Sequence, residues 1–158
     1  MSNMNILVAI GISVGILAGV WAGSSAYLQF ITFAGFLSWA SFYAAGGELK
    51  GLKDSLITNS SGVLWGFIIA TMAGYISPFL GNYAGLAIAV GIGAAAMVWQ
   101  ARFPLFGFIP GTFIGCSTYF ATNFDIKGSL IGLVLGALLG YLSQKGGQLI
   151  GKKEQVNN

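Results

Sequence analysis

Long uncharged stretches alternate with short charged ones along this chain. No Asp, Glu, Lys or Arg occurs in residues 1–47, 55–101, 103–124 and 128–144. A helix of about 20 residues crosses the hydrocarbon core of a bilayer, so each of the two longest runs has room for two spans and a turn. Breakers rich in Gly, Ser and Pro mark these turns. The pattern predicts six spans, at 5–26, 29–46, 55–76, 81–100, 105–123 and 128–144.

The composition agrees with a membrane-embedded chain. Of the 158 residues, 56% are hydrophobic and 7% are charged, and the mean hydropathy is +0.81. A soluble domain carries roughly 25% charged residues. The expected fold class is therefore an all-α integral membrane protein. We expect one six-helix domain over residues 1–146 and a polar cytoplasmic tail over residues 147–158.

The distribution of basic residues predicts the orientation in the membrane. Six spans place both ends of the chain on the same side. That side would carry Lys50, Lys53, Arg102, Lys145, Lys152 and Lys153, and the opposite side only Lys127. Such a bias marks the cytoplasmic side, so both termini are expected there. A cleaved signal peptide is the rival interpretation of the first span, but its first ten residues lack the usual Lys or Arg.

The chain also repeats itself, with residues 5–76 resembling residues 81–144. The matched pairs include Trp21 and Trp99, Ser41 and Ser117, Tyr43 and Tyr119, and Gly62 and Gly136. Each copy holds three spans, an odd number, so the second copy enters the membrane from the opposite face. The sequence thus predicts two inverted three-helix repeats, an architecture found in many channels and transporters.

Glycines recur at four-residue spacing in several spans. This spacing places small residues on one helix face, where two helix backbones can approach closely. We expect these stripes to be packing surfaces, within one subunit or between the subunits of a homo-oligomer. They comprise Gly11, Gly15, Gly19 and Gly23, then Gly62, Gly66 and Gly74, then Gly81, Gly85 and Gly93, and Gly128, Gly132, Gly136 and Gly140.

The predicted spans carry no charged side chain in their interior. Proton relays, ion-coupled carriers and voltage sensors place such groups inside the membrane, so these classes are disfavoured. The chain has no His and a single Cys, which disfavours an enzyme, a metal site, a cofactor site and an internal disulfide. Uncharged polar groups near the pseudo-two-fold axis between the two inverted repeats would suit a path for a neutral solute. The path-lining candidates are Ser41, Tyr43, Asn59, Ser60, Pro110, Gly111, Thr112, Ser117 and Tyr119.

The Pro110-Gly111 pair interrupts the apolar run that follows Arg102. Proline lacks an N–H group and disfavours helix in the residue before it. Two interpretations remain open. Either the "FPLFGFI" segment is non-helical or re-entrant and the helix begins near Pro110, or a continuous helix is kinked there.

Three segments resemble the YcdZ-like family of small bacterial inner-membrane proteins. They are "NILVAIGISVGILAGVW", "GFLSWASFYAAGG" followed by "LKGL", and "FIPGTFIGCSTYFA", of which "PGTFIG" is the most specific. The resemblance covers roughly residues 4–145 and implies a location in the bacterial inner membrane. It implies no substrate, because the family's function is unknown.

Three functions are consistent with these features. The leading hypothesis is a channel or facilitator for a small uncharged solute, embedded in the lipid bilayer as a homo-oligomer, with no nucleic-acid partner. The first alternative is a secondary transporter of a small metabolite or weak acid. The second is a structural or regulatory membrane subunit that transports nothing.

Overall fold

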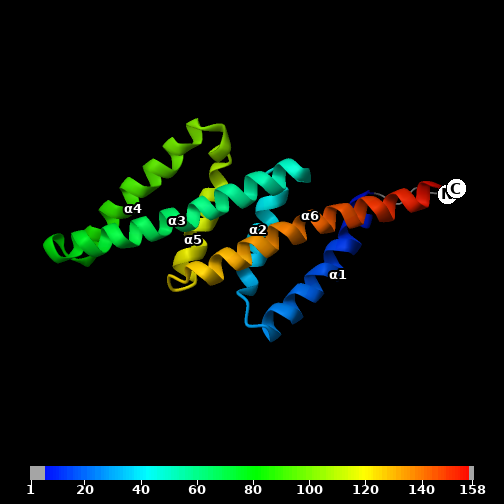
Figure 1. Ribbon diagram of the computed structural model, residues 1–158, viewed down its shortest axis with the longest axis horizontal. Coiled ribbons are helices and arrows are strands. Elements are labelled where there is room, and N and C mark those ends of the chain that lie inside the picture. Colours follow the sequence, from blue (N-terminus) through cyan, green and yellow to red (C-terminus); the bar gives the residue numbers. More distant parts are fainter. Residues whose placement is uncertain (1–5, 157–158) are drawn as a thin grey trace.

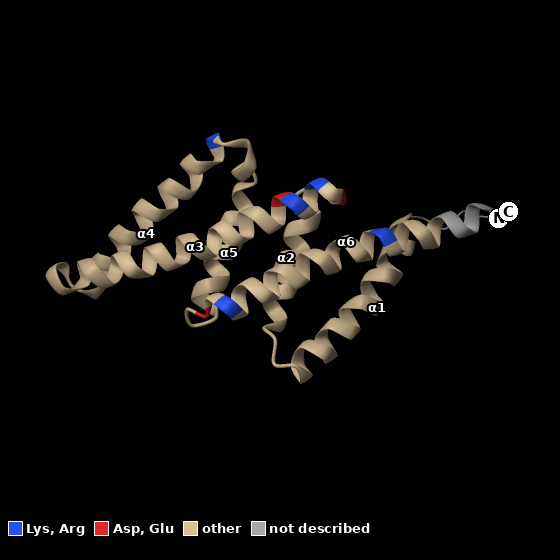
Figure 2. Ribbon diagram, viewed as in Figure 1, with Lys and Arg blue, Asp and Glu red and all other residues tan. Residues whose placement is uncertain are grey.

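The computed structural model describes residues 6–156 as an all-helical chain without strands (Figure 1). The α-helices are α1 (Ile6–Tyr27), α2 (Thr32–Ala44), α3 (Glu48–Leu80), α4 (Asn82–Trp99), α5 (Ile109–Ala121) and α6 (Ile126–Val156). Two short 3-10 turns, η1 (Gln100–Arg102) and η2 (Pro104–Phe106), connect α4 to α5. Figure 2 shows that most charged residues lie at helix ends and connections, where a bilayer tolerates charge, whereas Lys145 lies within α6.

All six predicted helices are present, but they differ in length. Within the described residues, four are long and apolar enough to cross a membrane: α1, α3, α4 with η1, and α6. By contrast, α2 and α5 have 13 residues each. At 1.5 Å per residue each is about 20 Å long, which is shorter than a hydrocarbon core of about 30 Å. The second and fifth helices are therefore shorter than the predicted spans.

Backbone conformation explains where the short helices stop. After α2, Gly46 and Gly47 have φ values of 97° and 68°, a region that glycine adopts without steric cost. After α5, Asn123 and Phe124 have φ values of 53° and 68°. These left-handed residues end the helices and turn the chain sharply into α3 and α6.

The two prolines near helix ends have different roles, and Pro110 matches the first of the two interpretations of the sequence. Helix α5 begins at Ile109 with Pro110 in its first turn, where the missing N–H is harmless. The preceding segment is not α-helical, so Pro110 starts a helix and does not kink one. Pro78 falls between the predicted spans 55–76 and 81–100, but in the structure it lies inside the last turn of α3, and Gly81 (φ 86°) makes the turn instead.

The helices exchange partners between the two halves of the chain. α2 packs chiefly against α6, and α5 packs against α3. α1 also lies along α6, and α4 lies along α3. Figure 1 shows α1 and α4 splayed outward on opposite sides of the centre. The start of α1 and the end of α6 lie together, with Gly147 against Ile10, so the two ends of the described chain are close in space.

Glycines allow the closest of these approaches. A Cβ atom at Gly62 would collide with the Thr112 carbonyl of α5, and one at Gly136 would collide with the Gly35 carbonyl of α2. Gly66 and Gly140 lie under the rings of Tyr119 and Phe42 respectively. The glycine stripe of α1 differs. A Cβ placed there would meet no atom within 4 Å beyond the neighbouring backbone of α1 itself, at any of Gly11, Gly15, Gly19 and Gly23.

These positions predict opposite effects for one substitution. Gly62→Ala should destabilise the fold by about 1–3 kcal/mol, because the new methyl overpacks the α3–α5 crossing. Gly15→Ala should leave the stability of the isolated chain unchanged or slightly higher, because its methyl meets open space. Reversible unfolding in mixed detergent micelles, followed by circular dichroism, measures both. Equal stability of the two variants would contradict the close crossing.

Candidate functional site

Four polar side chains meet at the centre of the molecule, and we call them the central polar cluster: Ser38 and Ser41 of α2 with Thr58 and Asn59 of α3. Each is at most 1% exposed. The Ser41 hydroxyl donates to Asn59 Oδ1 at 3.0 Å, and Asn59 Nδ2 donates to the Ser38 hydroxyl at 2.9 Å. Ser38 and Ser41 are three residues apart on one helix face, so one amide spans both hydroxyls.

The same amide also faces α5. A Cβ at Gly111 would lie 3.0 Å from Asn59 Oδ1 and would collide with Thr58 Oγ1. Asn59 therefore sits between the two short helices, contacting α2 through hydrogen bonds and α5 through van der Waals packing. The close packing at Gly111 leaves no room for a larger side chain there.

A second polar cluster holds the connection between α4 and α5. The Gln100 Oε1 atom accepts from the Ser61 hydroxyl and from Trp65 Nε1, each at 3.0 Å. Its Nε2 atom donates to Thr112 Oγ1 at 3.1 Å. One side chain thus ties η1 to α3 and to the first turn of α5. Sequence reasoning missed Gln100, although an amide at the end of an apolar span was a visible signal.

The sequence-predicted path residues lie in different environments. Ser41, Asn59 and Gly111 meet in the central polar cluster, and Thr112 lies beside it. Ser60 is half-buried and Pro110 is exposed. Tyr119 is 4% exposed and packs with Val63 and Leu133. Tyr43 and Ser117 lie apart from the cluster: the Tyr43 hydroxyl bonds Ser143 at 2.9 Å, and Ser117 is exposed.

Two of the matched pairs that suggested the repeat differ in burial in the structure. Trp21 is 5% exposed, whereas Trp99 is 68% exposed. Ser41 is fully buried, whereas Ser117 faces outward. Identical residue types had been aligned without regard to which helix face they occupy. These two pairs therefore do not occupy equivalent positions, whereas Gly62 and Gly136 both lie at close helix crossings.

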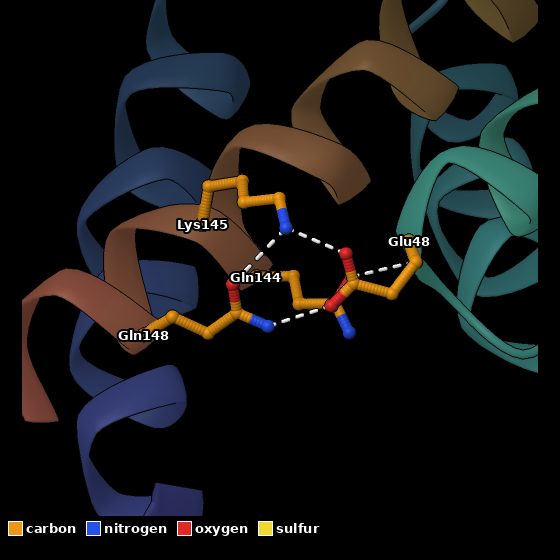
Figure 3. Close-up of polar contacts among 4 residues, drawn as sticks. All are labelled: Glu48, Gln144, Lys145 and Gln148. Carbon is orange, nitrogen blue, oxygen red and sulfur yellow. Dashed lines mark hydrogen bonds and ion pairs between the residues drawn. The ribbon is translucent and has the colours of Figure 1, made fainter.

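A third cluster joins the start of α3 to α6 (Figure 3). Lys145 Nζ donates to Glu48 Oε2 at 2.5 Å, and Gln148 Nε2 donates to Glu48 Oε1 at 2.7 Å. The Glu48 backbone N–H, unpaired within its own helix, donates to Gln144 Oε1 at 2.7 Å. Glu48 lies outside the uncharged runs, and its hydrogen bonds from Lys145 and Gln148 lower the pKa of its carboxyl. The cluster is exposed, so the ion pair fixes geometry more than it stabilises the fold.

Apolar grooves open on the outer sides of the molecule, among them one of about 470 Å³ lined by Phe30, Leu130, Ile131, Val134 and Leu135. The α4–α5 groove has a volume of about 650 Å³, and the α1–α2 groove about 180 Å³. The α4–α5 groove is lined by Ile69, Leu86, Val90, Ala94, Met97, Phe113, Cys116, Ser117, Phe120 and Ala121. The α1–α2 groove is lined by Val14, Ala18, Phe36, Trp39, Ala40 and Tyr43.

The chemistry available at the centre is uncharged. Among the described side chains, in residues 6–151, no three His, Cys, Asp or Glu side chains group in a way that could hold a metal ion. Every buried side-chain nitrogen or oxygen in this part of the chain has a hydrogen-bond partner. The central polar cluster can donate and accept hydrogen bonds, but it carries no charge to hold an ion.

Four membrane-length apolar helices around a small uncharged centre define an α-helical integral membrane protein. Residues 11–148 match the family model "Protein of unknown function (DUF1097)". The chain belongs to this family, which confirms the resemblance seen in the sequence.

The relatives agree with this assignment. The chain is 39% identical over 153 residues to "Uncharacterized protein YahC" of Escherichia coli K12, covering 92% of this chain and 93% of YahC. It is 40% identical over 145 residues to "Inner membrane protein YcdZ" of the same strain, covering 91% and 87%. YcdZ of Salmonella typhimurium LT2 is 36% identical over 154 residues, covering 96% and 94%. No solved structure matches the chain.

The Asn59 hydrogen bonds can be measured by a double-mutant cycle. Asn59→Ala and Ser41→Ala should each destabilise the fold, with a coupling energy of about 0.6–1.7 kcal/mol, the range for side-chain hydrogen bonds between membrane helices. Unfolding in mixed micelles gives the four free energies. Ser60→Ala serves as the matched control, because no hydrogen bond joins Ser60 to Ser41. Additive effects of Asn59→Ala and Ser41→Ala would show that the two side chains do not interact.

Proposed function

We propose that this protein is a non-enzymatic facilitator that passes a small uncharged solute across the bacterial inner membrane. In this proposal the two three-helix halves are inverted copies, and the solute crosses between α2 and α5 at the central polar cluster. Both termini are cytoplasmic, as the basic residues suggest, and the protein acts as a homo-oligomer.

The arrangement of the helices supports inverted halves. In Figure 1 a half turn about the viewing direction brings α4 toward the place of α1, α5 toward α2, and α3 toward α6. The helix contacts fit the same half turn, because it exchanges the pair α2 and α6 with the pair α5 and α3, and both pairs are in contact. An axis of this kind lies in the membrane plane when one copy enters from each face.

The burial pattern supports the same correspondence in a corrected register. Buried positions of α1 recur in α4 at an offset of 76 (Ala9 and Gly85, Trp21 and Met97). Those of α2 recur in α5 at 77 (Phe42 and Tyr119), and Gly62 and Gly136, 74 residues apart, both lie at close crossings. The residue pairs matched in the sequence are 78, 76 and 74 positions apart in the first, second and third helices. The first helix pair is therefore out of register by two residues and the second by one residue.

The observation that carries the proposal is the location of the central polar cluster. Its hydroxyls and amide are fully buried where the two 13-residue helices meet the long helix α3. A simple anchor has no use for such groups at its centre, whereas transport proteins commonly place binding sites beside discontinuous helices. The absence of charge in the cluster favours a neutral solute over an ion.

In this conformation the cluster is closed, because Ser38, Ser41 and Asn59 bond one another and the Thr58 hydroxyl bonds the Asp54 carbonyl of its own helix. Passage therefore requires α2 or α5 to move away from Asn59. A secondary transporter remains the second candidate, because the same inverted halves suit alternating access. Uptake that requires a proton or Na⁺ gradient would favour it over a facilitator.

Flux measurements test the facilitator and its path together. Proteoliposomes should equilibrate at least one of urea, glycerol, ammonia or water faster than empty liposomes in stopped-flow light scattering. Ser41→Ala should change that rate, because it removes a hydroxyl from the proposed path. Ser117→Ala is the matched control and should not change it, because Ser117 lies in the α4–α5 groove. Rates equal to those of empty liposomes for every solute would refute the facilitator.

The exposed face of α1 supports a homo-oligomer. Its Gly11–Gly23 stripe meets nothing within 4 Å, and it is flanked by large exposed apolar side chains such as Ile12 and Ile16. Bare backbone of this kind suits close helix contact in lipid, where packing drives association. The same face would suit a different membrane protein if the chain were a structural or regulatory subunit.

Gly15→Leu distinguishes these cases. It should shift the protein to a smaller mass in light scattering of purified protein in nanodiscs, because the leucine blocks close approach at the α1 stripe. Gly74→Leu, also in open space but on α3, should leave the mass unchanged. A wild-type protein that is monomeric and co-purifies with another membrane protein would favour the subunit hypothesis instead.

A further inference from the structure

We propose that the α4–α5 groove is a specific site for an anionic phospholipid, with one acyl chain in the groove and the phosphate on Arg102. This site is separate from the central polar cluster and does not depend on the proposed solute path.

The opposite half of the molecule provides an internal comparison. At the corrected offsets, Val14 and Ala18 correspond to Val90 and Ala94, and Phe36 to Phe113. All of these residues line the respective grooves. One corresponding pair differs greatly in size, since Trp39 stands where the other half has Cys116.

The Trp39 indole closes its groove. Its ring is 4% exposed, and its Nε1 atom donates to Ser143 Oγ at 3.0 Å. Ser143 corresponds to Ile69, an apolar side chain that lines the larger groove. The α4–α5 groove has a small thiol in place of the indole and an alkyl side chain in place of the hydroxyl. Its volume is therefore larger, about 650 Å³ compared with about 180 Å³ for the α1–α2 groove.

The groove has the chemistry and length of one acyl chain. Its wall is almost entirely hydrocarbon, with Ser117 the single hydroxyl among its side chains. From Leu86 to Met97, both on α4, it extends about 16 Å at 1.5 Å per residue. This is close to one leaflet, half of a hydrocarbon core of about 30 Å. An apolar wall of this depth within a bilayer is complementary to a lipid tail.

A positive charge lies at the end of the groove where α4 meets α5. Trp99, 68% exposed, is of the type enriched at the membrane interface, and Arg102 follows it in η1. Arg102 is the single charged residue between Asp54 and Asp125. No carboxylate of residues 6–151 forms an ion pair with it, and its guanidinium lies 5.0 Å from the Phe103 ring centroid. Guanidinium groups bind phosphate oxygens in a bidentate manner.

Hydrogen bonds of Gln100 hold η1, the first part of the connection between α4 and α5, in place. The Gln100 side chain bonds Thr112 on α5 and Ser61 and Trp65 on α3. It fixes η1, and therefore the backbone at Arg102, against the first turn of α5. The charge is presented at the headgroup level by a fixed segment, immediately beyond the apolar groove.

Native mass spectrometry of the full chain, released from nanodiscs with equal phosphatidylglycerol and phosphatidylcholine, tests the proposal. Wild-type protein should retain one phosphatidylglycerol per chain. Ser117→Phe should lower that occupancy about tenfold, equivalent to leaving two methylenes of the chain unburied. Arg102→Gln should abolish the preference for phosphatidylglycerol over phosphatidylcholine. Ala40→Phe in the smaller groove and Lys127→Gln are the matched controls and should match wild type.

Two results would overturn the site. One is full retention of phosphatidylglycerol by Ser117→Phe and by a second filling variant, Ala94→Leu, with circular dichroism verifying that each is folded. The other is a disulfide between Cys116 of one chain and Gly15→Cys of a second copy, since this would place protein and not lipid in the groove.

Discussion

The fold depends on two glycine crossings, where α3 meets α5 and α6 meets α2 at backbone contact distance. At Gly62 and Gly136 even one added methyl would collide with a carbonyl of the partner helix. In lipid the hydrophobic effect does not hold helices together, so dispersion at such close contacts must do so. Because each crossing joins one half of the chain to the other, the same contacts position the short helices and bring Asn59 between them.

The halves share a backbone plan but differ in the chemistry of their side chains. Asn59 bonds Ser38 and Ser41 in one half, whereas the corresponding position in the other half is Leu133, which packs in an apolar cluster. The exchange of Trp39 for Cys116 has the complementary effect on the outer surface. One half therefore holds the polar centre, and the other half holds the open groove. The two halves therefore present different side-chain chemistry, polar at the centre and apolar at the outer surface.

Uncharged runs and glycine spacing sufficed to predict six helices and a membrane location, because a bilayer penalises charge and loose packing at every residue. The lengths of α2 and α5 were not predictable in this way. They depend on left-handed residues such as Asn123 and Phe124, which no hydropathy pattern reveals. The sequence alignment of the two halves paired Trp21 with Trp99, which match in residue type but not in burial. Gln100 and the α4–α5 groove involve residues from three helices, so they appear only when those helices are assembled.

The exchange of partners has a consequence for how the protein is made. A chain is synthesised from its N-terminus, so α2 and α3 enter the membrane before α6 and α5, the helices against which they pack. Until then the Gly62 face of α3 and the Gly35 face of α2 lack the partner helices that they contact in the finished fold. The first half therefore has no finished tertiary structure of its own. After insertion, the first half must remain in the bilayer without aggregating until the second half is translated. The two halves then fold together.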